Sequence, residues 1–372
     1  MWRPFLLSAV VLMLPAARPD DSAATYPRIA MLWEPAEGAG DRLEAWARCG
    51  VSIVGPGALD LRWVRTPYRD LAVTIEPASV EGARARLADV HARNPRAVVC
   101  VEVNFFEARE NAYPPDSPWW QRDASGNKVR FWRGCYNLDT GNPEYVDHVA
   151  ARAEAVVKAL DGRAGLFLDN LRFDDRAKAG WTRLLDEIRR RCGEVPILVN
   201  AGWASDDLDW IAPRVNGLLY EDAIAHTRDG DAEAFYARVQ AQALKCRSPR
   251  IGVVEKFGPP GDGELMAREL ERTLVYTDLH YVYAESTDGH RTRWPAAWSA
   301  PLGKARTPAV VPAPGKLARR DFEGGTVLWL PSTAPAALVL PLDPPMTPVG
   351  STEALPEVRI APGTGWILLV TR

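Results

Sequence analysis

Short apolar segments alternate with segments of helical periodicity along most of the chain. Eight apolar segments fall between Arg28 and about Thr287: RIAMLWEP, GVSIVGPG, RAVVCVEVN, AGLFLDN, VPILVNAG, VNGLLYED, RIGVVEKFG and LHYVYAEST. The stretches between them, such as EYVDHVAARAEAVVKAL and GWTRLLDEIRRRC, repeat apolar residues at helical spacing. Strands that alternate with helices predict a parallel sheet with crossover connections. Eight βα units in about 260 residues predict an α/β fold of the (β/α)8 TIM barrel type, which typically takes about 250 residues.

Two details of the pattern bear on this prediction. An open, doubly wound sheet would alternate in the same way, but no Gly-rich dinucleotide-binding fingerprint follows the first predicted strand. The segments LRWV and LAVTIE, between the second and third predicted strands, fit the alternation less well. We interpret them as a hairpin inserted into the barrel.

The pattern changes after the eighth predicted strand. Residues 301–315 are rich in proline and lack periodicity, which is typical of a linker. Beyond them, ARRDFEGGTVLWLP, AALVLPL and TGWILLVTR are short β-like runs with Gly and Pro turns. We therefore expect a barrel domain over residues 25–300 and a small C-terminal all-β domain over residues 316–372. The smaller domain either packs against the barrel or binds sugars.

Residues 1–24 have the pattern of a secretory signal peptide. Arg3 precedes the apolar run FLLSAVVLML, and the small residues Ser22–Ala24 offer a cleavage site. The run is too short for a stable membrane anchor, and a buried N-terminal helix is the alternative. We expect a mature protein that starts near Thr25, is secreted or periplasmic, has no membrane span and is a monomer.

The net charge and the absence of several motifs limit which binding partners and cofactors are expected. A net charge of −3, from 45 basic and 48 acidic residues, creates no field that would attract nucleic acid or an anionic membrane. The five cysteines form no CxxC pair, and the five histidines form no HxH or HExxH motif, so we expect no metal site and no other cofactor. An odd number of cysteines leaves at least one thiol free. A serine nucleophile of the GxSxG type is also absent.

Most of the predicted strands end in a carboxylate. This position matters because the carboxyl ends of the strands surround the active site of a TIM barrel. Six acids at eight strand ends exceed the one or so expected from 48 acidic residues in 372. A lone Asp there can simply cap the next helix, and glutamates can form salt bridges at the barrel mouth. The ends are Glu34, Gly55, Glu102 or Asn104, Asp169, Asn200, Glu221, Glu255 and Glu285.

Glycoside hydrolysis is the chemistry that needs acids and little else. One carboxyl group donates a proton to the leaving oxygen, and an ionised carboxylate attacks the sugar or activates water. Crowding acids together separates their pKa values, so both forms are present at one pH. An acid-rich, exported barrel with 14 tryptophans fits this demand, because indole rings suit flat ligands.

Several segments also carry a family resemblance. GLFLDNLRF followed by PILVNAG and VNGLLYEDAI resembles the strand-four to strand-six core of glycoside hydrolase family 114 and related barrel-type glycosyl hydrolases. WWQRDASGNKVRFWRGCYNLDTGNPEY is similar to the stretch before their fourth strand, and RRDFEGGTVLWLPS resembles their C-terminal β segment. The resemblance implies a barrel that acts on a polysaccharide, with Asp169 and Glu221 as the catalytic acids. Family 114 acts on galactosaminogalactan-like polymers.

The remaining candidates are assigned to substrate binding. The segment Phe105–Asn142 is long for a βα connection and rich in aromatic residues, and such loops are usually functional. We interpret it as a substrate-binding lid, although the loop can also pack on itself. Asn170 would orient Asp169, and each of the others can instead fill the barrel interior. The substrate-binding candidates are Glu34, Glu102, Asn104, Trp119, Trp120, Asn170, Asn200, Tyr220, Glu255, Tyr283 and Glu285.

The sequence thus favours a secreted, endo-acting glycosidase, and three other functions stay open. A metal-assisted barrel enzyme of the enolase kind would use acids with Lys or His bases, and only Lys256 lies near a strand end. A non-catalytic polysaccharide-binding barrel would bind glycan without turnover. A structural envelope protein would bind no polysaccharide at all.

Overall fold

The computed structural model describes residues 25–132, 134–226, 232–285 and 290–371. The predicted signal peptide, residues 1–24, lies outside the described residues. Within the described part of the chain, no helix is long and apolar enough to cross a membrane. All five cysteines are free thiols; Cys192 is partly exposed and the other four are buried.

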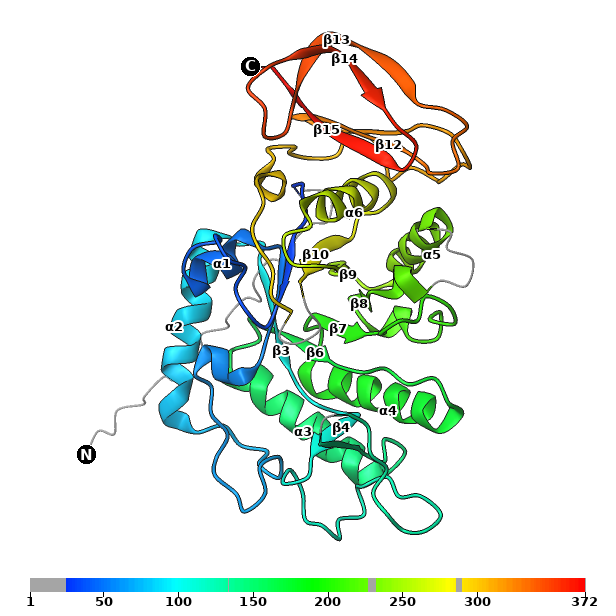
Figure 1. Ribbon diagram of the computed structural model, residues 1–372. Helices are drawn as coiled ribbons and strands as arrows, with labels where there is room; N and C mark the ends of the chain where they lie inside the picture. Colours follow the sequence, from blue (N-terminus) through cyan, green and yellow to red (C-terminus); the bar gives the residue numbers. More distant parts are fainter. Residues whose placement is uncertain (1–24, 133, 227–231, 286–289, 372) are drawn as a thin grey trace, which may run out of the picture.

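Eight parallel strands form the barrel, as the apolar segments predict (Figure 1). Neighbouring strands pair in chain order, and β10 returns to the first strand through a hydrogen bond from Tyr281 N to Arg28 O of 2.9 Å. The prediction of a TIM barrel with a C-terminal all-β domain is therefore confirmed. The barrel strands are β1 (Ala30–Leu32), β2 (Val51–Val54), β3 (Val98–Glu102), β6 (Gly165–Leu168), β7 (Ile197–Asn200), β8 (Gly217–Glu221), β9 (Val253–Phe257) and β10 (His280–Ala284).

Helices follow the strands and cover the barrel. The two helices expected from periodicity are present, but α4 begins earlier than GWTRLLDEIRRRC indicates, because the Asp174 side chain accepts a hydrogen bond from Ala177 N and caps it. The α-helices are α1 (Arg42–Arg48), α2 (Pro77–Arg93), α3 (Pro143–Ala159), α4 (Asp175–Cys192), α5 (Ala232–Lys245) and α6 (Gly263–Tyr276). Single 3-10 turns are η2 (Pro56–Leu59), η3 (Ala212–Arg214), η4 (Ala223–His226) and η5 (Ala296–Ser299).

Two insertions interrupt the βα pattern on the way to the fourth barrel strand. LRWV and LAVTIE approach each other as an antiparallel pair through the bridge between Trp63 and Ile75, as the hairpin prediction requires. The long connection after β3 contains a second antiparallel pair, β4 (Glu107–Arg109) and β5 (Cys135–Asn137). This pair brings Glu107 close to the barrel mouth, by which we mean the carboxyl ends of the strands.

The C-terminal domain is one antiparallel sheet with the order β11-β12-β15-β13-β14. It packs on α6, which lies between the sheet and the barrel (Figure 1). Residues 301–315 lie between these two parts, where Val310 N donates to Val275 O and Arg306 N donates to Asp321 O. The domain boundaries at this segment stay a prediction. The strands are β11 (Ala318–Asp321), β12 (Gly325–Leu330), β13 (Leu338–Pro348), β14 (Leu355–Ile360) and β15 (Thr364–Val370).

A buried arginine joins the two domains. Arg320 on β11 is 1% exposed, and its guanidinium donates to the carbonyl oxygens of Leu274 at 2.8 Å and Thr277 at 2.5 Å. It also pairs with Asp278 at 2.5 Å. Since Leu274 and Thr277 mark the end of α6, Arg320 supplies donors and positive charge where a helix terminus lacks donors for its last carbonyls.

We expect Arg320→Ala to lower the free energy of unfolding by about 3 kcal/mol, because charged hydrogen bonds to buried carbonyls are lost. Arg319→Ala is the matched control, since the Arg319 side chain on the same strand is 57% exposed and should change stability by less than about 0.5 kcal/mol. Urea unfolding of both variants measures the difference. Equal stability of the two would contradict the role given to Arg320.

Candidate active site

One amide group holds the two predicted catalytic acids together. Asn200 Nδ2 donates to Asp169 Oδ1 at 2.7 Å and to Glu221 Oε2 at 2.7 Å. Asn200 Oδ1 accepts from Gly202 N at 2.7 Å, so this hydrogen bond fixes which end of the amide faces the acids. The three residues come from the ends of β6, β7 and β8, which are neighbours in the sheet. The structure therefore brings Asp169 and Glu221 into one site.

A second amide links this pair to the loop after β3. Asn170 Nδ2 donates to Asp169 Oδ2 at 2.9 Å and to Glu107 Oε2 at 3.3 Å. The other oxygen of Glu107 accepts from Trp132 Nε1 at 2.8 Å. Both carboxylate oxygens of Asp169 thus accept hydrogen bonds from amides, an arrangement that favours its ionised form.

Two more glutamates complete the acid cluster, which we define as Glu102, Glu107, Asp169, Glu221 and Glu255. Trp33 Nε1 donates to Glu102 Oε2 at 3.4 Å. Glu255 is fully buried, and its Oε1 lies 2.5 Å from His290 Nδ1, while Oε2 has no partner among the described residues. The His290 ring lies 4.6 Å from the Trp33 ring.

Burial raises the pKa values of four acids of this cluster. The pKa of Asp169 rises to about 6, although the Asn200 hydrogen bond lowers it. Burial, together with the charge of Asp169, raises the pKa of Glu102 to about 7. Burial also raises the pKa values of Glu107 and Glu255 to about 7. The site therefore holds protonated and ionised carboxyl groups together near neutral pH, which acid–base chemistry requires.

The pKa of His290, the partner of Glu255, is raised as well. Burial lowers the pKa of His290, but the hydrogen bond and charge of Glu255 outweigh it, so the net pKa is raised. His290 is therefore more readily protonated than an ordinary histidine.

These shifts predict how stability depends on pH. An acid with a raised pKa in the folded protein contributes stability below its unfolded pKa, about 4.5 for Glu102, and loses it as the pH rises through about 7. Glu102→Gln keeps a neutral side chain of the same shape. Melting temperatures should thus fall less steeply for this variant than for the parent between pH 4.5 and about 7. Glu34→Gln, at the exposed rim, is the control, and parallel profiles of Glu102→Gln and parent would contradict the burial argument.

Several substrate-binding candidates lie away from the cluster. Side chains alternate along a strand, so Tyr220 faces outward next to inward-facing Glu221, and its hydroxyl donates to Gln242 of α5 at 2.7 Å. Tyr283 likewise faces outward and donates to Pro259 O at 2.8 Å. Glu285 accepts from Gly261 N at 3.1 Å instead of joining the acids. The expectation that Tyr220 and Tyr283 contact substrate is therefore wrong, because both side chains face away from the barrel interior. The role of Glu285 stays a prediction.

The aromatic lid prediction needs a correction at Trp119 and Trp120. Trp120 is 2% exposed and packs against Tyr113, and half-buried Trp119 lies against Tyr145. These rings pack together under the loop, as the self-packed alternative predicts. Glu34 and Asn104 are exposed at the rim.

Sequence reasoning missed Trp33, Glu107 and His290. No strand-end rule finds Glu107, since it lies in the hairpin after β3. Two of the missed residues have an unusual backbone conformation: φ is 54° at Trp33 and 49° at His290, and it is 62° at Asn170. Residues other than Gly rarely adopt this left-handed conformation, which occurs often at functional sites but is also found here at Asp60, Asp161 and Asp207.

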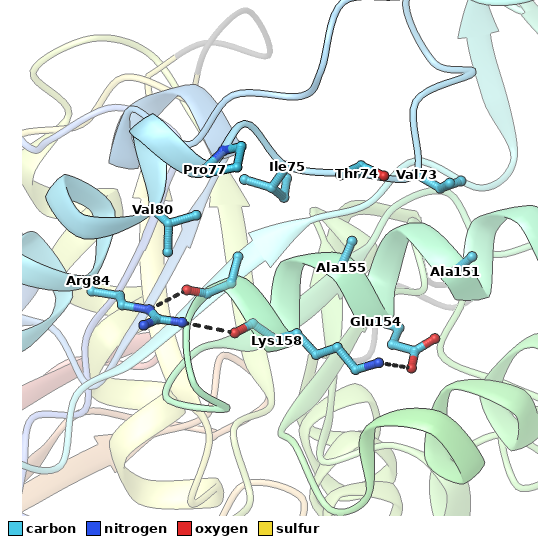
Figure 2. A pocket seen from close by; sticks show the side chains of 11 residues that line it. Val73, Thr74, Ile75, Pro77, Val80, Arg84, Ala151, Glu154, Ala155 and Lys158 are labelled. Carbon is cyan, nitrogen blue, oxygen red and sulfur yellow. Dashed lines mark hydrogen bonds and ion pairs between the residues drawn. The ribbon is translucent and has the colours of Figure 1, made fainter.

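Three hollows on the outer surface are lined by no residue of the acid cluster. A groove of about 550 Å³ lies between α2 and α3 (Figure 2). Arg84 crosses its end and donates to the carbonyl oxygens of Ala159 and Lys158, while Lys158 pairs with Glu154. Its charged side chains are thus engaged within the protein. Among the described residues, no group of three or more His, Cys, Asp or Glu side chains is arranged to hold a metal ion.

Comparison with known proteins supports the class of fold. No protein-family model and no curated protein matches the sequence. A maltogenic α-amylase from Thermotoga neapolitana is similar in structure, with a TM-score of 0.55 and 10% identity, over 92% of this chain and 99% of that chain. The cyclic α-maltosyl-(1→6)-maltose hydrolase of Arthrobacter globiformis has a TM-score of 0.54 and 14% identity, over 95% and 100% of the two chains.

A third similar structure is the debranching enzyme of Nostoc punctiforme, with a TM-score of 0.52 and 12% identity over 96% of this chain and 100% of that chain. These structural neighbours are glycoside hydrolases. At such low identities the likeness concerns the fold: a TIM barrel followed by a C-terminal β-sheet.

Proposed function

We propose that this protein is a glycoside hydrolase that cleaves O-glycosidic bonds within a polysaccharide, with Asp169 and Glu221 as its catalytic pair. The observation that carries the proposal is the single amide nitrogen of Asn200 that binds both carboxylates. The glycoside hydrolases with the same fold support it as an analogy. Membership in glycoside hydrolase family 114, which the strand-four and strand-six segments suggest, is part of this proposal.

The spacing of the pair favours retention of configuration. Asp169 Oδ1 and Glu221 Oε2 each lie 2.7 Å from the same nitrogen, so they are no further apart than twice that distance. Retaining glycosidases separate their carboxyl groups by about 5–5.5 Å, and inverting enzymes by about 6.5–9.5 Å, which leaves room for a water molecule.

The hydrogen bonds favour one assignment of roles. Asp169, whose oxygens both accept from amides, is ionised and attacks the anomeric carbon. Glu221 gives its proton to the leaving glycosidic oxygen, so the bond to the leaving sugar breaks as the Asp169 ester forms. Glu221 then takes a proton from water, which attacks the anomeric carbon and releases Asp169.

Location belongs to the same proposal. We propose that the mature protein starts near Thr25 and acts outside the cytoplasm, because an apolar run and small residues precede that position. Intact Met1 on protein recovered from the periplasm or medium would contradict export.

Release of reducing ends from soluble starch, xylan, chitosan and galactosaminogalactan tests the activity. We expect at least one polysaccharide to be cleaved into oligosaccharides, as an endo-acting enzyme would do. Binding to a polysaccharide without any release of reducing ends would favour a non-catalytic binding protein. Release of monosaccharides alone from the start of the reaction would contradict endo action.

A further inference from the structure

Two tryptophans in loops that follow barrel strands are exposed although most large apolar side chains are buried. Trp132 is 47% exposed and Trp203 is 63% exposed. By contrast, Trp46 and Trp181, which serve packing in the core, are 0% exposed. An exposed indole presents a broad apolar face to the solvent, which suits a flat ligand.

Trp132 lies on the Asp169 side of the site. Its Nε1 donates to Glu107, which is linked to Asp169 through Asn170. The neighbouring residue, Phe131, is held by Arg172, whose guanidinium lies 4.5 Å from the Phe131 ring and 4.1 Å from the Phe106 ring. Since Arg172 follows Asp169 by three residues, this cation–π contact ties the Trp132 segment to the loop that carries the catalytic acid.

Trp203 lies in the loop after β7, the strand between those that carry Asp169 and Glu221. Gly202, which directly precedes it, donates its N–H to Asn200 Oδ1 at 2.7 Å. The carbonyl oxygen of Gly202 accepts from Glu221 N at 3.1 Å. The backbone at Trp203 is therefore fixed against both the bridging amide and the second catalytic acid.

We propose that Trp132 and Trp203 are stacking platforms for sugar rings beside the Asp169–Glu221 pair, one on the loop after β3 and the other on the loop after β7. Trp132 is bonded to Glu107, at one end of the chain of contacts that runs through Asp169 and Asn200 to Glu221. The backbone of Gly202, directly before Trp203, is bonded to Asn200 and Glu221. A polysaccharide bound on both platforms is held beside the acids at more than one of its units. The ligand class is a glycan of several units whose rings expose an apolar face, and the inference rests on the proposed function.

Binding and turnover are measured separately. Affinity electrophoresis through gels that contain soluble starch, xylan, chitosan or galactosaminogalactan uses the inactive Glu221→Gln protein, so the glycan stays intact. In that background Trp132→Ala and Trp203→Ala should each weaken binding roughly tenfold to the polysaccharide that slows the parent protein in the gel. The loss of one aromatic contact of this size lowers affinity by about that factor. With Glu221 restored, each variant should raise KM for the polymer by a similar factor.

Three further variants separate stacking from other effects. Trp132→Phe and Trp203→Phe keep a ring and should recover most of the binding, although Trp132→Phe loses the hydrogen bond to Glu107. Trp366→Ala, in the C-terminal sheet, is the matched control and should bind like the parent. Thermal melting verifies that every variant is folded.

The outcomes distinguish the two proposals. Weaker binding of both alanine variants with recovery by phenylalanine supports the platforms. Cleavage by the parent together with unchanged binding and KM in both alanine variants overturns the platforms and leaves the proposed function intact. A parent that neither binds nor cleaves any of the four polysaccharides overturns the proposed function and the platforms with it.

Discussion

Glu221→Gln should lower kcat by about 10²–10⁴-fold on a polysaccharide that the parent cleaves, because the variant cannot donate a proton to the leaving oxygen. Asp169→Asn should lower kcat at least as much, since an amide cannot form the ester with the sugar. Both substitutions preserve shape, so the fold should stay intact. Initial rates of reducing-end release, with circular dichroism as a check on folding, measure the effect.

Glu285→Gln is the matched control for these two variants. Glu285 also follows a barrel strand, but it bonds to Gly261 N and lies 3.2 Å from Arg293, away from the pair. Its rate should stay close to that of the parent. Near-parental turnover by Glu221→Gln or Asp169→Asn would show that the pair is misassigned, and Glu102, Glu107 or Glu255 would then be the acids to replace.

Asn200→Ala should lower kcat by about 10²-fold, because a displacement of catalytic groups by about 1 Å has an effect of that size. It should also shift the pH dependence. The Asn200 hydrogen bond lowers the pKa of Asp169, so its loss raises that pKa, and the acidic limb of the kcat profile moves to higher pH. A purely structural role for Asn200 would leave the position of that limb unchanged.

Asn216→Ala provides the comparison. Asn200 and Asn216 are both 2% exposed, and Asn216 binds Ile197 N at 3.0 Å, at the opposite end of β7 from the acids. Both variants lose buried hydrogen bonds and should be less stable than the parent. Only Asn200→Ala should shift the pH profile, and a shift of equal size in Asn216→Ala would contradict the positioning role.

The barrel could be predicted because it depends on periodicity. A polar residue that ends an apolar strand lies at the mouth of a TIM barrel, so six strand-end acids were expected there, and the choice of Asp169 and Glu221 among them came from the family resemblance. The same period of two places Tyr220 on the outer face, since it precedes inward-facing Glu221. Asn200 was expected to bind substrate, and its amide nitrogen instead binds the two acids.

The loop residues of the site were not predicted, and the reason is physical. Glu107 and His290 reach the acids from segments whose paths are set by tertiary contacts and not by a hydrophobic repeat. Trp119 and Trp120 were predicted to bind substrate, but a cluster of aromatic residues in a long loop indicates either a binding surface or a small core. Packing against Tyr113 and Tyr145 decides for the core here.

The anomeric configuration of the first product tests the central claim most directly. Proton nuclear magnetic resonance of the reaction mixture, recorded before mutarotation, identifies which anomer is released at the cleaved bond. Because one nitrogen bridges Asp169 and Glu221, the account predicts that the product keeps the configuration of the substrate linkage. Release of the inverted anomer would require carboxyl groups about 6.5–9.5 Å apart and would contradict the catalytic pair described above.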